Sequence, residues 1–439
     1  MVVGVPKEVV DGERRVALVP EGVAKVRDRG LEVAVEAGAG RDFHPDSAYE
    51  EAGARVVAHP QRVWDEADVV AKVRAPTDDE VESAREGELI VSFLPPVPSA
   101  ELIKRLAGRG VTAVSVDAIP RIARAQSMDA LSSQSSVAGY KCVLLAADAL
   151  GKYLPMMTTA AGTTQAAKVL VLGAGVAGLQ AIATARRLGA DVSAFDIRPE
   201  TKEQVESLGA TFVEEGREER SGSPAPAAAS AAPRSGLAGL WDELKLAFGV
   251  SSDGKAGDDS VAAAPGDDEE EGGESATAPG GYAREQAEDK QRRDRELLER
   301  HLSDVDVVIT TALVPGRRAP ILLTADMVDA MSPGSVVVDL AAEMGGNCEL
   351  TIPGETTEHD GVRILGPRDV PSGVPIHASQ FYSRNVLNLL THLLDDEGRL
   401  ELDFDDEITD QAVVCHAGEV RHAGAREALE QAAGAGAGR

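Results

Sequence analysis

The sequence predicts an α/β fold with two domains, each built on a parallel sheet, and a cleft between the domains. The chain has 439 residues, more than one hydrophobic core usually serves. Short apolar runs alternate with charged stretches of helical periodicity, as in sheets whose strands are connected by helices. Hydrophobic residues make up 43% of the chain and aromatic residues only 3%, which favours the small aliphatic cores common in α/β proteins.

The first domain is predicted from residue 1 to about 135. Its strands are expected at five apolar runs, namely 2–5, 31–36, 67–73, 88–93 and 110–116. A long helix is predicted from Ser136 to Tyr153, because Val137, Tyr140 and Leu144 recur at helical spacing. We expect the chain to return to this domain with residues 376–404, which include a helix from about Gln380 to Leu394.

The second domain is predicted at residues 136–375. Its first strand is expected at 168–172, followed by a glycine-rich turn, a helix at 179–188 and a strand at 191–196. Further strands are expected at 304–310, 335–340 and 361–365. Four or five such strands make a complete nucleotide-binding sheet, so both domains are expected to be Rossmann-like.

Two segments are expected to remain outside these domains. Residues 216–280 are rich in Ala, Pro, Gly, Ser and acidic residues, a composition that predicts a disordered acidic insert. Within this insert, Leu237, Trp241, Leu244 and other apolar residues share one helical face, which indicates either a docking helix for a partner or a transient helix. The tail at 425–439 has little apolar surface and is predicted to be flexible.

Charge and cysteine content exclude several classes of function. The formal net charge of -29 would repel nucleic acid and anionic membrane surfaces. Because salt screens such self-repulsion, a halophilic source is one hypothesis, and an acidic mesophilic protein with a charged insert is the other. Three distant cysteines indicate neither a disulfide framework nor a metal site. Without a long uncharged apolar run or a signal segment, a cytoplasmic protein with no direct membrane insertion is expected.

A dinucleotide fingerprint opens the second domain. Gly173, Gly175 and Gly178 follow a buried strand and begin a helix, so that Gly173 permits the tight turn and Gly175 lets backbone amides approach a pyrophosphate. Gly178 allows close packing of the helix. Asp196 ends the next strand, where a carboxylate accepts hydrogen bonds from the adenosine ribose and repels a 2′-phosphate. This predicts NAD rather than NADP, although Arg198 could instead serve a 2′-phosphate.

A second polar segment, residues 120–134, precedes the fingerprint. It contains Arg121, Gln126 and Asp129 together with several serines. A guanidinium, an amide and a carboxylate on one short segment can hold a pyrophosphate, a ribose and a carboxamide, which is what orienting a nicotinamide ring requires. The alternative is a polar loop that ends in the N-cap of the next helix.

Several ordered motifs together resemble one known family. They are Gly-Val-Pro-Lys-Glu at 4–8, Arg15-Val-Ala, Arg-Ala-Gln-Ser-Met-Asp-Ala-Leu-Ser-Ser at 124–133, the glycine turn, Arg-Pro-Glu-Thr-Lys-Glu-Gln-Val at 198–205, Thr-Thr-Ala-Leu-Val-Pro-Gly at 310–316 and Gly-Gly-Asn-Cys-Glu at 345–349. With them the chain resembles the NAD(H)-binding α subunit, domain I, of proton-translocating NAD(P) transhydrogenase, within the alanine dehydrogenase/transhydrogenase family. The match covers nearly the whole chain outside the insert.

The resemblance implies roles for individual residues. Arg121, Gln126, Asp129 and Ser132 match the loop that holds the nicotinamide and its ribose, with Gln126 facing the second nucleotide. Tyr282 matches a mobile-loop tyrosine that closes over the bound nucleotide, and Leu313 would line the cofactor cleft. The other residues expected to contact the cofactor are Ser127, Met128, Val176, Ile197 and Gly281.

The resemblance also implies a mechanism and partners. Hydride would pass directly between the nicotinamides of NAD(H) bound here and NADP(H) bound by the β subunit, with no general acid or base. The expected partners are that β subunit, a separate α polypeptide that carries membrane helices, and a second copy of this chain. The complex would attach the chain to the inner face of the cell membrane. The acidic insert lies just before Gly281, where the family loop is short.

Two other classes of protein compete with this interpretation. Alanine dehydrogenases share the pattern, and Arg15 and Lys72 resemble their pyruvate-binding pair. However, residues 89–98 contain Leu and Pro where the dehydrogenases place a catalytic His, so the proton shuttle is missing. No other residue is expected to serve as the proton shuttle. His44 and His59 lie in the wrong segments, and a histidine such as His377 is more often structural. Glu343 is expected to pair with no suitable base. The third class is a non-catalytic NAD-binding subunit, because one fingerprint binds only one dinucleotide.

Overall fold

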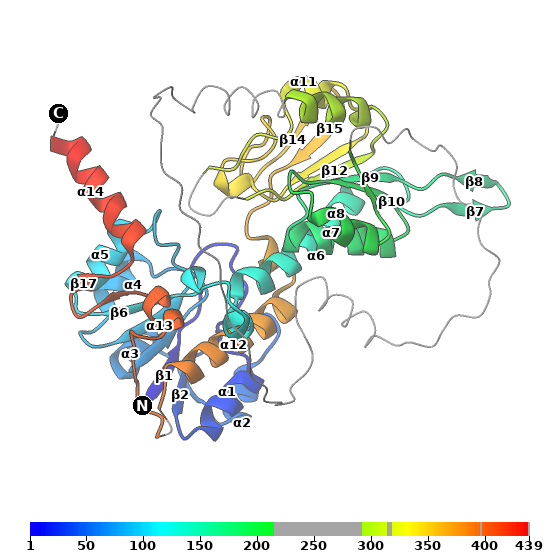
Figure 1. The fold of residues 1–439 in the computed structure, drawn as a ribbon. Helices are drawn as coiled ribbons and strands as arrows, with labels where there is room; N and C mark the ends of the chain where they lie inside the picture. Colours follow the sequence, from blue (N-terminus) through cyan, green and yellow to red (C-terminus); the bar gives the residue numbers. More distant parts are fainter. Residues whose placement is uncertain (215–291, 314–317, 396, 438–439) are drawn as a thin grey trace, which may run out of the picture. The chain divides into compact units, whose positions relative to one another are not determined.

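The computed structural model describes residues 1–214, 292–313, 318–395 and 397–437 (Figure 1). The predicted acidic insert with the Trp241 segment, as well as Gly281 and Tyr282, lie outside the described residues. The chain divides into two compact units, one of Met1–Val213 with Leu302–Arg439 and one of Glu214–His301. Of the second unit, Glu214 and residues 292–301 are described, and residues 292–301 are helical.

The first sheet has eight strands in the described residues, in the order β17-β16-β6-β5-β4-β1-β2-β3. Six of them are parallel: β1 (Val2–Val5), β2 (Glu32–Glu36), β3 (Arg55–Val57), β4 (Val69–Ala71), β5 (Leu89–Ser92) and β6 (Thr112–Ser115). The connecting helices are α1 (Pro20–Asp28), α2 (Asp46–Glu51), α3 (Pro60–Glu66), α4 (Asp78–Ser83) and α5 (Ala100–Gly108). The five predicted strands are confirmed, and the order 3-2-1-4-5-6 is that of a Rossmann sheet.

The C-terminal part of the chain contributes more to this sheet than the sequence predicted. Helix α12 (Pro375–His392) is followed by α13 (Glu407–Ala412) and by the strands β16 (Val413–His416) and β17 (Glu419–Val420). Strand β16 pairs antiparallel with β6, so the return of the chain continues beyond residue 404. The short apolar run 412–415 is buried and could not be distinguished from a helix end by periodicity.

The expectation of a flexible tail is wrong for most of that segment. Residues Ala423–Ala437 form helix α14. Ala425 is buried, and Ala428 and Leu429 pack against the hydrophobic cluster that includes Ile103 and Leu106 of α5. The three apolar positions have i, i+3 and i+4 spacing, so they form one narrow stripe that docks onto the first domain although it could not support a fold alone.

The second sheet has seven strands in the described residues, in the order β11-β10-β9-β12-β13-β15-β14. Six are parallel: β9 (Lys168–Leu172), β10 (Asp191–Phe195), β11 (Thr211–Phe212), β12 (Val307–Thr310), β13 (Val336–Asp339) and β15 (Val362–Leu365). The five predicted strands are again confirmed. Three features were not predicted, namely the short edge strand β11, the antiparallel strand β14 (Thr356–His359) and, outside this sheet, an exposed hairpin of β7 (Met157–Thr159) and β8 (Gly162–Thr164).

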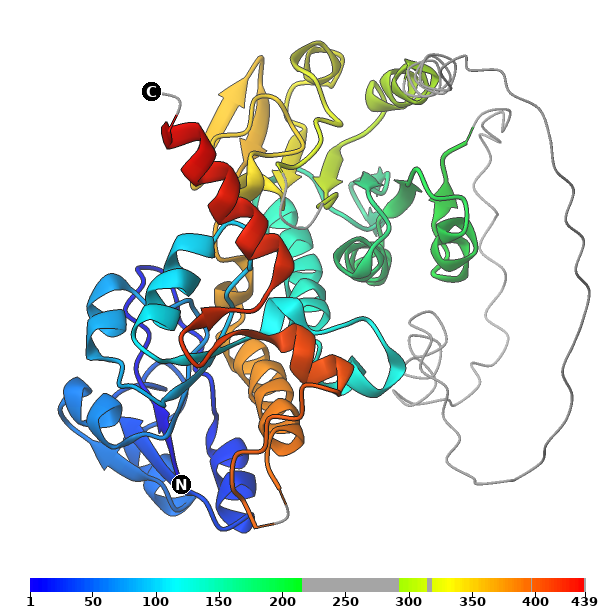
Figure 2. The same ribbon diagram turned by 60° about the vertical axis from the view of Figure 1, so that its left-hand side comes forward.

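Helix α6 (Ala130–Ala149) contacts both α12 and α7 (Val176–Arg187). It begins six residues earlier than the predicted Ser136, because Asp129 caps its N-terminus. A Cβ on Gly139 would lie 2.1 Å from the carbonyl oxygen of Ala177, so this glycine permits the close approach of α6 and α7. Figures 1 and 2 both show α12, in orange, beside the cyan segment that leads into α6.

The remaining helices of this unit are short. They are α8 (Thr201–Ser207), α11 (Ala325–Asp329) and the 3-10 turns η1 (Val116–Ala118), η2 (Ala123–Met128), η3 (Ala342–Met344) and η4 (Val370–Gly373). Across the described ranges, no helix has both the length and the apolar character that crossing a bilayer requires.

Candidate nucleotide-binding site

The glycine turn between β9 and α7 has the geometry of a phosphate site. Gly173 has φ +102°, and a Cβ there would lie 2.8 Å from Thr311 Oγ1. A Cβ on Gly178 would lie 1.9 Å from the Gly173 carbonyl oxygen, so only glycine lets the helix approach the turn. Among the described residues, no heavy atom lies within 4 Å of a Cβ on Gly175, and no side chain caps the helix at this residue. The space beside Gly175 at the N-terminus of α7 is therefore open, and the uncapped N-terminus of a helix fits a pyrophosphate.

Asp196 directly follows β10 and faces the same turn. Its Oδ2 accepts a hydrogen bond from the Ala174 N–H at 2.7 Å, and its Oδ1 accepts one from the Arg198 N–H at 2.9 Å. Burial raises the pKa of this carboxyl, but hydrogen bonds from Arg198 and Ala174 outweigh burial and lower it. An ionised acceptor at this position fits a ribose with free hydroxyls better than one with a 2′-phosphate.

The Arg198 guanidinium also bonds the Asp196 carboxylate, at 3.0 Å through Nε and at 2.9 Å through Nη2. This side chain is 52% exposed and can move away when a ribose approaches. In the structure Arg198 thus neutralises Asp196. Ile197 is exposed between the two residues.

Leu313 lies in the loop after β12 and is exposed. Asn347 holds this loop, since its Nδ2 donates to the carbonyl oxygens of Ala312 and Pro320 and its Oδ1 accepts from the Ala312 N–H at 3.0 Å. Asp339 in turn holds the Asn347 backbone N–H at 2.8 Å. The position of Leu313 is therefore set from the end of β13.

Asp339 is fully buried and was not singled out from the sequence. Its carboxylate accepts five hydrogen bonds, from Thr310 Oγ1, Ala341 N–H, Asn347 N–H, Cys348 N–H and Thr351 Oγ1. These bonds compensate for removing the charge from water. The available signal was an acidic residue at the end of an otherwise apolar strand run, shortly before the Gly-Gly-Asn-Cys-Glu motif.

In the polar segment 120–134, Asp129 and Ser132 contact each other. Asp129 Oδ1 accepts from the Ser132 N–H at 2.8 Å and Oδ2 accepts from Ser132 Oγ at 2.5 Å. The helix-cap interpretation is thus confirmed for this pair. Both residues remain partly exposed. Their role toward a cofactor remains a prediction.

Arg121, Gln126 and Ser127 are exposed on the same segment. Among the described residues, the side chains of Arg121 and Gln126 have no hydrogen-bond or ion-pair partner. Met128 differs, because its side chain is 7% exposed and belongs to the hydrophobic core of the first domain. The role of Met128 toward a cofactor stays a prediction.

The two cations that resemble a pyruvate-binding pair are buried and already paired. Arg15 Nη2 lies 2.6 Å from Glu13, and Lys72 Nζ lies 2.5 Å from Glu80 and 3.5 Å from Glu8. Burial would raise the pKa of Glu13, but hydrogen bonds from Arg15 and Ser372 lower it to about 2. The carboxylates that neutralise Arg15 and Lys72 are thus side chains of this protein and not those of a substrate.

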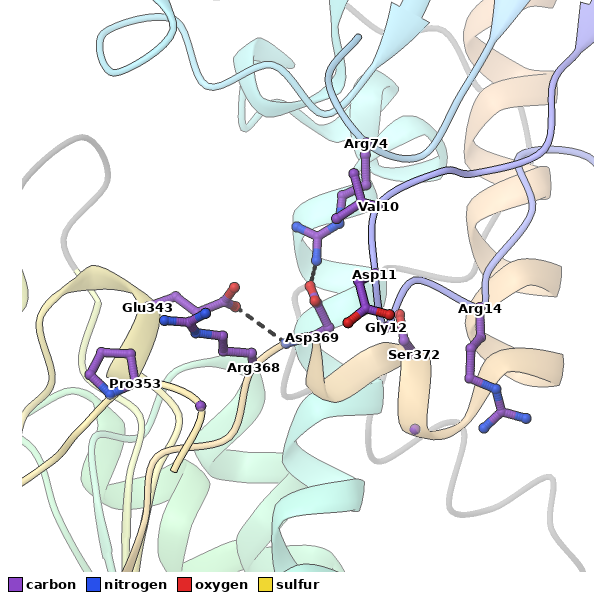
Figure 3. Close-up of a pocket in the computed structure, with 12 residues that line it drawn as sticks. Val10, Asp11, Gly12, Arg14, Arg74, Glu343, Pro353, Arg368, Asp369 and Ser372 are labelled. Atoms are coloured by element: carbon purple, nitrogen blue, oxygen red, sulfur yellow. Dashed lines mark hydrogen bonds and ion pairs between the residues drawn. The ribbon is translucent and has the colours of Figure 1, made fainter. Parts of the chain in front are cut away.

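A cavity of about 880 Å³ lies beside these pairs (Figure 3). Its lining includes Arg74, Glu343 and Asp369. Arg74 forms an ion pair with Asp369 and donates to Glu13 at 2.9 Å, while Glu343 accepts weakly from the Asp369 N–H at 3.5 Å.

Leu94 follows β5 and is fully buried, and its N–H donates to Asp117 Oδ2 at 2.6 Å. Burial raises the pKa of Asp117 to about 6, although hydrogen bonds from Leu94 and Ser115 oppose this. His377 is exposed in the first turn of α12. Asp117 was not predicted as a site residue from the sequence.

The glycine turn, the acidic residue after β10 and the two Rossmann-type sheets define the class of the protein, a two-domain dinucleotide-binding protein. The chain belongs to the alanine dehydrogenase/PNT family. The N-terminal domain of that family matches residues 4–138, and the C-terminal domain matches residues 142–423.

Several relatives within this family are transhydrogenase subunits. The NAD(P) transhydrogenase subunit alpha of Haemophilus influenzae is 40% identical and is matched over 95% of this chain and 71% of its own length. A protein of Rhodospirillum rubrum, named as the first part of an NAD(P) transhydrogenase subunit alpha, is 39% identical, over 96% of this chain and 98% of its own. The solved transhydrogenase structure from Sinorhizobium meliloti is 40% identical, covers 96% of this chain and 100% of its own, and has a TM-score of 0.75. The alanine dehydrogenase of Bacillus subtilis is more distant, at 28% identity over 85% of this chain and 81% of its own.

Proposed function

We propose that this chain is the NAD(H)-binding component of a proton-translocating NAD(P) transhydrogenase. Hydride passes between NAD(H) bound here and NADP(H) bound by the β subunit, and separate membrane subunits couple this transfer to proton translocation. The observation that supports the proposal most is a glycine turn whose geometry fits a dinucleotide. In addition, the position after β5 where a dehydrogenase needs a proton carrier is occupied by Leu94. The transhydrogenase relatives at about 40% identity support it.

The residues present fit NAD(H). The open N-terminus of α7 at Gly175 would hold the pyrophosphate, and Asp196 would accept the hydroxyls of the adenosine ribose. The unpaired side chains of Arg121 and Gln126 would hold the nicotinamide end, and Leu313 would line the cleft. When bound, the nicotinamide supplies or accepts the hydride at its C4 atom. The chain contributes position, orientation and exclusion of water.

The buried ion pairs argue against the alternative, an alanine dehydrogenase. An oxo-acid carboxylate would have to displace Glu13 from Arg15, or Glu8 and Glu80 from Lys72, in a nearly solvent-free environment. The position after β5 that would need a proton carrier is a buried leucine, Leu94. At the positions that resemble a dehydrogenase site, amino-acid oxidation therefore lacks a cation free to bind the substrate, because Arg15 and Lys72 are already paired, and Leu94 supplies no proton carrier.

The proposed partners follow the same reasoning. We infer a β subunit that binds NADP(H), a separate α polypeptide with membrane helices and attachment to the inner face of the cell membrane. The name of the Rhodospirillum rubrum relative, which calls it one part of a subunit alpha, is consistent with an α subunit made of more than one polypeptide. A homodimer is also proposed, for which the exposed hairpin β7–β8 and the exposed Tyr153 and Met156 beside it offer a surface. Sedimentation of the purified chain tests the dimer, since a monomer at micromolar concentration would contradict it.

The deciding experiment mixes the purified chain with the NADP-binding domain of a transhydrogenase β subunit. We expect NADPH to reduce an NAD analogue only when both proteins are present. Oxidation of L-alanine with NAD by the chain alone would support the dehydrogenase instead. NADH binding without either activity would favour a non-catalytic NAD-binding subunit.

A further inference from the structure

The segment 120–134, called here the clamp, is held by α12 through two side-chain amides. The carbonyl oxygen of Ser127 accepts hydrogen bonds from Asn385 Nδ2 at 2.9 Å and from Asn388 Nδ2 at 3.0 Å. The two asparagines are three residues apart on one helix and therefore project from the same face. Both acceptor positions of this carbonyl group are thus occupied by one helix.

Asn385 also holds the other end of the clamp. Its Oδ1 accepts a hydrogen bond from Ser133 Oγ at 2.7 Å, and the residue is 7% exposed. One buried amide group therefore spans from Ser127 to Ser133. The cap residues Asp129 and Ser132 lie between these two points.

Two further contacts fix the clamp. Gln134 accepts from Arg15 Nη1 at 2.9 Å and donates to the Ala378 carbonyl oxygen at 3.0 Å, again on α12. Arg124 forms an ion pair with Asp406, which caps α13 and lies 3.0 Å from His392 Nε2. Burial would raise the pKa of Asp406. The hydrogen bonds that its carboxylate accepts, mainly from the Thr409 N–H and from Arg124, lower this pKa to about 2.

These contacts involve the clamp backbone and its inward side chains, while Arg121 and Gln126 remain unpaired and exposed among the described residues. A short 3-10 turn such as η2 has poor hydrogen-bond geometry of its own. Its conformation therefore depends on partners outside it. The side-chain amides of Asn385 and Asn388 on α12 are such partners, and they contact this turn at Ser127.

We propose that Asn385 and Asn388 are positioning residues for hydride transfer, which hold the Ser127 carbonyl group and thereby orient Arg121 and Gln126 toward the nicotinamide end of the nucleotide. This inference rests on the proposed function. Neither asparagine contacts the glycine turn in the described structure, so the two residues govern the orientation of the ring rather than the binding of the adenosine half. Their effect is expected on the rate more than on affinity.

The test replaces Asn388 by Leu, which has a similar volume and no donor. Asn388→Gln keeps a donor on a longer side chain. Arg384→Ala on the same helix is the control, because Arg384 is 57% exposed and, within the described ranges, its side chain pairs only with Glu21, at 3.9 Å. Asn388→Ala serves as a second variant if the leucine prevents folding. Each protein is compared with the wild type for NADH affinity by calorimetry and for hydride transfer with the β-subunit NADP-binding domain.

We expect Asn388→Leu to lower kcat about tenfold or more, since a displacement of about 1 Å at a reacting centre costs roughly 100-fold in rate. The dissociation constant for NADH should change less than about threefold, because the adenosine half remains bound as before. Asn388→Gln should lie between Leu and wild type, and Arg384→Ala should equal wild type. Unchanged kcat in a folded Asn388→Leu protein overturns the proposal, as does a Gln variant no better than Leu.

Amide hydrogen exchange of residues 123–129 without nucleotide separates this inference from the proposed function. If α12 holds the clamp, Asn388→Leu accelerates exchange in this stretch and leaves the glycine turn unchanged. Equal exchange in variant and wild type overturns the inference even when the wild type transfers hydride. A wild type that shows no NADH binding and no hydride transfer contradicts the proposed function, and a clamp loosened by the variant then supports only the part of the inference by which α12 holds the clamp.

Discussion

At the scale of single residues, buried carboxyl groups determine how stability responds to pH. Asp117 lies beside the backbone of Leu94 at the end of the first sheet. Burial raises its pKa from an ordinary 3.8 to about 6, so the folded state prefers the protonated form. Its contribution to stability is fully present below pH 3.8 and is lost as the pH rises through about 6.

Asp117→Asn keeps an acceptor for the Leu94 N–H but cannot ionise. We expect the variant to match the wild type near pH 4 and to exceed it above pH 6 by about 2 kcal/mol, allowing for solvent screening. Urea unfolding at a series of pH values measures this difference. A constant offset across the whole range would contradict the assigned titration.

The preference for NADH over NADPH is a second property that we expect a single residue, Asp196, to determine. Asp196→Asn keeps the hydrogen bond from Ala174 but removes the negative charge and frees Arg198. We expect NADH to bind more weakly and NADPH more tightly, so that the ratio of the two affinities falls about tenfold. Calorimetry with each nucleotide measures the ratio. Arg198→Ala is the matched variant and should move the ratio in the opposite direction.

At the scale of helices and strands, close approach of α6 and α7 connects the clamp with the glycine turn. Gly139 makes this contact possible, since a Cβ there would overlap the backbone of Ala177. We expect Gly139→Ala to lower the free energy of unfolding by about 2 kcal/mol or more. Gly108→Ala, at the end of α5 with open space around it, should be neutral or stabilise by up to about 1 kcal/mol. Denaturant unfolding of both variants checks the contrast, and equal effects would show that the contact does not matter.

The elements also show which parts of the fold could be predicted from the sequence. Long apolar runs such as 168–172 identify strands that are buried on both faces, and the spacing of the glycines at 173, 175 and 178 indicates the turn. The hairpin β7–β8 and the strand β14 lack such runs, because their residues are mostly exposed. Strand β16 depends on partners far away in the sequence, since Cys415 Sγ contacts the carbonyl oxygen of Val111 across a separation of 304 residues.

In the candidate site, too, residues whose roles depend on distant contacts could not be predicted from the sequence. Residue type and spacing were enough to single out Asp196, Arg121 and Gln126. They did not indicate Asp339, Asn385 or Asn388, whose roles depend on contacts between distant segments. Met128 was assigned from its neighbours in sequence, but a 3-10 turn places its side chain in the core.

At the scale of the whole molecule, the acidic surface sets the response to salt. The net charge of -29 produces self-repulsion that opposes the compact state. Raising NaCl from about 0.01 M to about 1 M shortens the screening length from roughly 30 Å to roughly 3 Å. We therefore expect the Tm to rise by several degrees, with most of the gain at the lower concentrations. Sucrose of equal osmolality is the control, and an equal rise in sucrose would contradict an electrostatic origin.

The central claim is that this chain presents one bound nucleotide for direct hydride transfer to a second protein. The most direct measurement supplies NADPH deuterated at C4 to the chain and the β-subunit NADP-binding domain, with an NAD analogue as acceptor, and follows the label by mass spectrometry. We expect the transferred deuterium to appear in the reduced analogue without dilution by solvent hydrogen, because no acid–base group or water takes part. Solvent hydrogen in the product, or reduction that proceeds without the NADP-binding domain, would contradict it.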